Sequence, residues 1–132
     1  MDKKALKAVV NEYPLLCAEG WGLADPFGDR AALSNEEMCR EFNRSQNTLL
    51  NDVEGFREAC RWWKGRKQTK TIESKRSPNS FSLKYLAQRQ MRIHPSHGAF
   101  IAAAIYCGFQ VKAISGSPNV LVNLSSRSLP GR

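Results

Sequence analysis

The chain has few of the residues that build well-known small catalytic or metal sites. It has two histidines, and its four cysteines lie far apart, without the close pairs of zinc knuckles or redox motifs. We interpret His94 and His97 as turn or helix-cap residues, and we expect no metal site and no cofactor. The cysteines are expected to be reduced and mostly buried: Cys17, Cys39, Cys60 and Cys107.

Long hydrophobic runs are also missing. The longest, residues 99–107, is well short of the roughly 20 residues that a membrane helix needs. No apolar stretch of a signal peptide follows the first residues, so we expect a cytoplasmic protein. Hydrophobic content of 42% and charged content of 24% are ordinary for a globular protein, and 132 residues suit one domain with a single core.

Acidic residues are scarce where basic residues are densest. Residues 57–92 hold eleven Lys and Arg against Glu58 and Glu73, a net charge of +9, whereas the whole chain carries +8. Residues 93–132 have no acidic side chain. Such a concentration of one sign indicates a polyanionic partner, with nucleic acid the first candidate. Because the chain also lacks a Gly-rich phosphate loop and a nucleophile elbow, we do not expect an enzyme.

The N-terminal part, residues 1–64, is predicted to be mostly helical. A short helix over residues 3–13 ends at Pro14. Residues 15–33 contain several turn formers and are expected to form a long loop, in which Trp21 packs on the core or contributes to a binding surface.

A second helical region begins at Ser34, which opens a capping box. The apolar spacing favours two helices, over residues 35–43 and 47–64, with Asn51 or Asp52 as the alternative cap of the second.

Two neighbouring tryptophans lie near the end of that second helix. Trp62 and Trp63 are about 100° apart around the helix axis, so we expect one of them to be partly exposed. Trp63 continues the apolar face. Trp62, beside Arg61 and Arg66, is predicted either to stack on a base or to lie flat over a neighbouring loop under an Arg side chain.

Residues 65–80 are predicted to be an exposed basic linker, with a short strand at residues 69–72. Lys and Arg alternate there with Ser, Thr, Gln and Asn, which supply donors for phosphate oxygens.

The C-terminal part, residues 81–126, is predicted to be a helix, a second helix and a β-hairpin. The first helix covers residues 82–92 after a Ser80 or Ser82 cap. The second follows Ser96 and is nearly all apolar, so we expect it to be central and buried.

The predicted strands of the hairpin are residues 109–114 and 120–124. This order of elements is that of a winged helix-turn-helix. Its second helix has almost no polar side chain to read base edges, so contacts would come from the basic linker, the helix at 82–92 and the turn at 115–119.

A resemblance covers residues 69–126. The stretches Ser80-Phe81-Ser82-Leu83-Lys84, residues 98–104, Gly108-Phe109 and Pro118-Asn119-Val120 with Asn123 resemble a C-terminal pattern in small uncharacterised proteins of phages, plasmids and integrated elements. The resemblance implies a bacterial mobile element as the setting. Accessory nucleic-acid binders and inhibitors of host defence, including anti-CRISPR proteins, are both common there.

We therefore predict a single, mostly helical α+β domain with a C-terminal β-hairpin that binds DNA or RNA without catalysis. The alternative is an inhibitor or adaptor that binds a host protein or nucleoprotein complex through Trp21, Phe27 and Trp62. The residues predicted to bind nucleic acid are Arg61, Trp62, Arg66, Lys67, Lys70, Lys75, Arg76, Lys84, Arg89 and Arg92.

Overall fold

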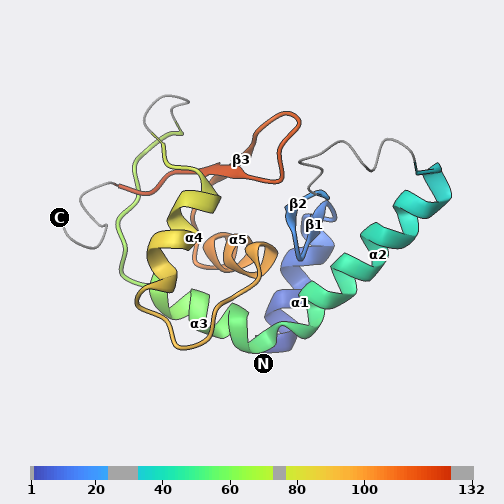
Figure 1. Ribbon diagram of the computed structural model, residues 1–132. Helices are drawn as coiled ribbons and strands as arrows, with labels where there is room; N and C mark the ends of the chain where they lie inside the picture. Colours follow the sequence, from blue (N-terminus) through green and yellow to red (C-terminus); the bar gives the residue numbers. More distant parts are fainter. Residues whose placement is uncertain (1, 24–32, 73–76, 126–132) are drawn as a thin grey trace.

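A computed structural model describes residues 2–23, 33–72 and 77–125 (Figure 1). Within these ranges the chain forms an α+β fold of five helices and two small antiparallel sheets of two strands each. None of the helices described combines the length and apolar character needed to cross a membrane. The elements, in chain order, are α1 (Asp2–Glu12), β1 (Leu16–Cys17), β2 (Gly20–Trp21), α2 (Asn35–Asn51), α3 (Val53–Trp63), α4 (Ser80–Gln88), α5 (His97–Tyr106), β3 (Val111–Ala113) and β4 (Val120–Val122).

Helix α5 lies at the centre of the molecule (Figure 1). Every residue from 98 to 104 is buried, and α5 packs against α3, α1, α4 and the hairpin of β1 and β2. The Ser96 hydroxyl accepts the Ala99 N–H at 3.2 Å and so caps its first turn. The sequence prediction of a Ser96-capped central helix is confirmed.

The N-terminus of α5 touches β1 directly. Gly98 donates its N–H to the Ala18 carbonyl at 3.2 Å, and a Cβ at this position would overlap the Cys17 carbonyl oxygen. Only glycine therefore allows α5 and β1 to approach this closely. The strands β1 and β2 lie within residues 15–33, for which the sequence had predicted only a loop.

Helix α2 is continuous where the sequence favoured a break at residues 44–46. Leu49 is its one buried residue among those described, and part of the polar run that suggested the break contacts the β1 region: the Gln46 amide donates to the Pro14 and Leu16 carbonyls, at 3.0 and 3.1 Å. The capping box at Ser34 is confirmed. The alternative cap is also confirmed, because Asp52 accepts the Gly55 N–H at 3.2 Å at the start of α3.

Asp52 also joins two helices. Its second carboxylate oxygen accepts the Ser96 N–H at 2.8 Å, just before α5. One side chain therefore caps α3 and holds the approach to α5, and the chain turns sharply between α2 and α3 at this residue.

The C-terminal hairpin pairs β3 with β4, and Val111 lies opposite Val122. The other edge of β4 is occupied by the two ends of the basic linker. Thr69 donates its N–H to the Asn123 carbonyl at 2.8 Å, and Val122 donates to the Pro78 carbonyl at 3.0 Å. The predicted strand at residues 69–72 is wrong, because the pairing consists of an isolated bridge one residue earlier, between Gln68 and Leu124.

Helix α4 starts and ends earlier than the predicted range of 82–92. Its N-cap is Asn79, whose side chain accepts the Ser82 N–H at 2.9 Å, and not Ser80 or Ser82. The Ser80 hydroxyl is instead buried and used elsewhere. After Gln88 the chain turns and crosses the end of α3 on its way to α5 (Figure 1).

We expect the substitution Gly98→Ala to lower the free energy of unfolding by about 3 kcal/mol, the upper part of the usual cost of overpacking a core. The obstacle is the backbone carbonyl of Cys17, which cannot turn aside as a side chain could. Urea denaturation of the variant beside the wild type measures the change. Equal midpoints and slopes for the two proteins would contradict the close packing of α5 on β1.

Candidate nucleic-acid interface

The expectation that one of the two tryptophans is exposed is wrong. Trp62 is 6% exposed and Trp63 is fully buried. Both rings reach Phe100 of α5, with centroid distances of 5.6 Å and 4.9 Å. The residues after α4 cover Trp62, and Gln90 accepts its indole N–H at 3.0 Å. The 100° separation is real, but two long side chains can converge on one Phe when a second segment closes over the outer ring.

Arg66 completes this cluster. Its guanidinium lies 3.9 Å from the centroid of the Trp62 ring, and its Nε donates to the Trp62 carbonyl at 2.8 Å. Burial lowers the pKa of Arg66. Of the two alternatives that the sequence left open for Trp62, the structure therefore agrees with the one in which the ring lies under an Arg side chain. The Trp62 ring then has no open face on which a base could stack.

Lys67 and Lys70 are exposed on the linker. The Lys67 carbonyl accepts the Ser125 N–H at 2.8 Å, so the backbone beside these lysines is held against the C-terminal strand. Lys75 and Arg76 lie outside the described residues. The linker is therefore attached to the fold at both of its described ends.

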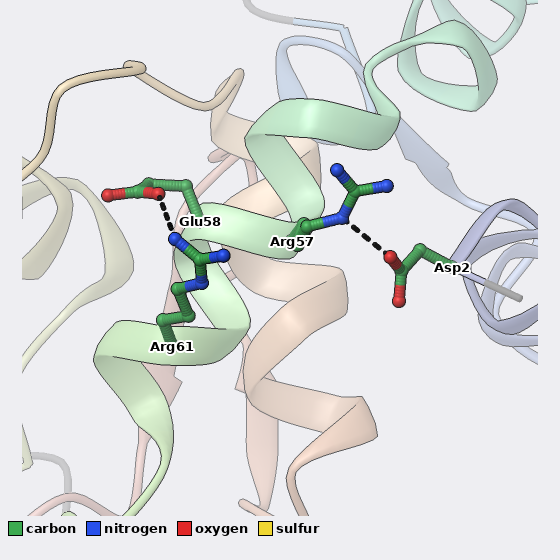
Figure 2. Close-up of polar contacts among 4 residues, drawn as sticks. All are labelled: Asp2, Arg57, Glu58 and Arg61. Carbon is green, nitrogen blue, oxygen red and sulfur yellow. Dashed lines mark hydrogen bonds and ion pairs between the residues drawn. The ribbon is translucent and has the colours of Figure 1, made fainter.

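Arg61 projects from α3 close to an acidic neighbour. Its guanidinium lies 3.7 Å from the Glu58 carboxylate one turn back, and its side chain is 71% exposed (Figure 2). Arg57, on the same helix, pairs instead with Asp2 at 2.6 Å, and this hydrogen bond lowers the pKa of Asp2 (Figure 2). Because most of the Arg61 side chain lies in water, although that of Glu58 does not, solvent screens the pair and Arg61 stays accessible to an anion.

The remaining predicted cations lie on α4 and just after it. Arg89 and Arg92 are exposed, whereas Lys84 is partly buried and burial lowers its pKa. Residues 77–125 contain no acidic side chain, so no carboxylate of this segment offsets the charge of Lys84, Arg89, Arg92 and Lys112. The structure thus gathers Arg66, Lys84, Arg89 and Arg92 around α4 and its continuation.

Two aromatic side chains on α4 were not among the predicted site residues. Phe81 is 58% exposed and Tyr85 is 61% exposed, one helical turn apart. The Arg89 guanidinium lies 5.8 Å from the centroid of the Tyr85 ring. The helical spacing contained the signal, since Leu83 and Ala87 take the core side of α4 and leave residues 81 and 85 on the outer side.

A buried hydrogen-bond chain holds α4 against α5 and β4. The Ser80 hydroxyl lies 2.8 Å from His97 Nε2, and its oxygen accepts the Val120 N–H at 2.9 Å. His97 Nδ1 lies 3.1 Å from the Glu19 carbonyl, which can only accept. The neutral imidazole with its proton on Nδ1 therefore satisfies every partner.

Ser80 and His97 form a hydrogen-bonded pair of the kind found in catalytic serine dyads, but the Ser80 hydroxyl is not accessible to a substrate. Ser80 has no exposed surface, and its oxygen already accepts a backbone N–H. A substrate cannot reach this hydroxyl, so we assign the pair a structural role.

The cysteines divide into two groups. Cys17 and Cys60 are buried as predicted, Cys107 is intermediate, and Cys39 is exposed, against the prediction for the set. The Cys107 thiol lies 3.8 Å from the Cys60 carbonyl oxygen. Interaction with Cys107 and burial raise the pKa of Cys60, whereas interaction with Cys60 lowers that of Cys107. Among the residues described, no three His, Cys, Asp or Glu side chains group as metal ligands do.

Comparison of the chain with protein-family models, with curated proteins and with solved structures found no match.

The stability of the protein should depend on pH through His97. Burial lowers the pKa of His97 to about 4, from 6.5 for a solvated histidine. Between these pH values the unfolded chain binds a proton that the folded chain excludes, so the free energy of unfolding falls as pH falls from about 6.5 to 4. The loss should reach about 3 kcal/mol.

Urea denaturation at several pH values measures this loss. His97→Gln removes the titrating group and should flatten the dependence in this window, whereas the same change at exposed His94 should preserve it. A wild-type slope that persists in His97→Gln would assign the pH dependence to other groups.

Proposed function

We propose that the protein binds nucleic acid without catalysis, mainly through phosphate contacts. The observation that carries the proposal is the set of exposed cations on the linker and at the end of α4, namely Lys67, Lys70, Arg89 and Arg92, together with the absence of acidic side chains from residues 77–125. Lys and Arg side chains arranged in this way neutralise phosphates and release counterions, which provides affinity without reading sequence.

The cations of this surface are held in different ways. Arg66 is fixed over Trp62, whereas Arg61, Lys70 and Arg92 are exposed. A guanidinium held in place by stacking and by hydrogen bonds loses little side-chain entropy when it meets a phosphate. Arg66 is therefore proposed as the fixed contact and the exposed side chains as adaptable ones.

The order α4, α5 and β3–β4 supports the interpretation that the fold resembles a winged helix. In this interpretation the contacts with nucleic acid come from elements other than the second helix. In the usual docking of such folds, the second helix enters the major groove. Here α5 is buried from residue 98 to residue 104, so it is a structural helix. We assign the nucleic-acid contacts to α4 and to the linker pinned on β4, which favours backbone recognition over base-specific reading.

The alternative function, an inhibitor or adaptor that binds a host protein or nucleoprotein complex, loses part of its expected surface. Trp62 is buried, and Trp21 is half-buried with its ring 5.9 Å from that of Tyr13. Phe27 lies outside the described residues. Tyr85, one of the two exposed aromatic residues on α4, lies beside the Arg89 guanidinium, which favours a nucleic-acid ligand.

We expect the triple variant Lys67→Ala, Lys70→Ala and Arg92→Ala to weaken binding to all sequences alike. The slope of log affinity against log salt should fall by about 2 to 3, because each lost phosphate contact removes about 0.7 on single strands or 0.9 on duplex DNA. Fluorescence anisotropy with labelled DNA and RNA, over a series of salt concentrations, measures both quantities.

A matched control replaces Lys3, Lys4 and Lys7 by Ala. These three lysines are exposed on α1, and their loss changes the net charge by the same amount. The control should keep the wild-type slope. If wild-type protein binds no nucleic acid at low salt, and instead co-purifies with a host protein after nuclease treatment, the alternative function is correct.

A further inference from the structure

We propose that the outer face of α4 is a stacking platform for single-stranded nucleic acid, on which Phe81 and Tyr85 each take one base. This stacking role rests on the proposed function and specifies single-stranded nucleic acid as the ligand. It also replaces Trp62, whose ring is covered, as the source of base stacking.

The exposure of these two rings has no explanation in the packing of α4. The core side of the helix is already supplied by Ser80, Leu83 and Ala87, which are buried against the rest of the fold. Phe81 meets His97 only at its edge, with ring centroids 6.3 Å apart. Phe81 and Tyr85 each leave more than half of their surface in water, and their positions one turn apart on the same side of α4 make them an adjacent pair and not isolated surface side chains.

The spacing of the rings selects a single strand. Residues four apart on a helix are separated by about 6 Å along its axis. Bases in a duplex follow one another every 3.4 Å or so along each strand and hide their faces in the stack. Two aromatic residues whose backbone positions are about 6 Å apart along the helix therefore suit neighbouring bases of a strand whose bases have come apart, as in proteins that bind single strands through aromatic side chains.

The basic residues near the two rings also favour a single-stranded nucleic acid as the ligand. Arg89 lies one turn beyond Tyr85 and reaches its ring at 5.8 Å, and Arg92 follows with an exposed side chain. Lys84 lies between the two aromatic positions in sequence, on the same helix. Aromatic residues alternating with cations present a π-face to each base and a charge to each phosphate.

The platform is rigid before any ligand arrives. The Asn79 side chain caps α4, and the Ser80 hydroxyl joins the helix to His97 and to the backbone of Val120. Phe81 follows Ser80 directly, so its backbone is held by this network. Preorganisation of this kind lowers the entropic cost of binding.

The test uses the full chain, a labelled mixed-sequence single strand of about 12 nucleotides and the matching duplex. We expect the double variant Phe81→Ala and Tyr85→Ala to bind the single strand about 100-fold more weakly, about tenfold for each stacked base. Duplex affinity should change little, and the salt slope on the single strand should stay at the wild-type value because no cation is removed.

Two further variants separate stacking from general apolar contact. The double variant Phe81→Leu and Tyr85→Leu keeps apolar surface but has no ring, so it should bind the single strand nearly as weakly as the Ala variant. Tyr85→Phe keeps the ring and should bind as the wild type does. Circular dichroism shows whether each variant remains folded, which we expect because both side chains are exposed.

Each outcome separates this inference from the proposed function. Single-strand affinity that survives the Ala or Leu variants overturns the platform, while a salt slope that still depends on Lys67, Lys70 and Arg92 leaves phosphate binding standing. Equal loss on the single strand and on the duplex overturns the assignment to single strands. Binding to a host protein that the Ala variant loses and the Leu variant retains, with no nucleic acid bound by the wild type, overturns both proposals and assigns the face to a protein.

Discussion

The burial of α5 from residue 98 to residue 104 is the constraint on which the rest of the structure depends. A helix with no polar face must be covered on every side, because each exposed apolar side chain forfeits its transfer free energy. Helices α1, α3 and α4 and the hairpin of β1 and β2 supply this cover. The Ser96 hydroxyl caps the first turn of α5, and the Asp52 carboxylate accepts the Ser96 N–H just before that turn. Each covering element has one side committed to α5 and can use only its outer side for function.

This commitment divides the basic stretch of residues 57–92 into structural and accessible parts. Trp62 and Trp63 are both buried in the core, and Arg66 covers the ring of Trp62. Helix α4 has the opposite arrangement, with small and aliphatic side chains inward and two aromatic rings outward. The basic residues that form one cluster in the sequence therefore have two locations in the fold. Arg66 covers Trp62, whereas other basic side chains are exposed at the surface.

Three small or polar residues of the C-terminal part have structural roles in this chain. Ser80 joins α4 to His97 and β4, and Gly98 allows α5 to meet β1. Asn123 is 1% exposed, donates to the Thr69 carbonyl at 3.0 Å and accepts the Gln110 N–H at 2.7 Å, so it ties the linker and β3 to β4. Buried polar groups that are fully paired in this way specify one arrangement of the chain, which is a requirement of the fold and not of a ligand.

Features that depend on near neighbours in the chain could be predicted from the sequence: the capping box at Ser34, the helix that Ser96 begins, the apolar character of α5 and the concentration of positive charge. They follow from local hydrogen bonds and from periodicity. The cover over Trp62, the pairing of the linker with β4 and the extent to which Phe81 and Tyr85 are exposed are set by the tertiary structure. These outcomes depend on which distant segment reaches each side chain. The residues after α4 cross Trp62, whereas the described segments leave more than half of each α4 ring exposed.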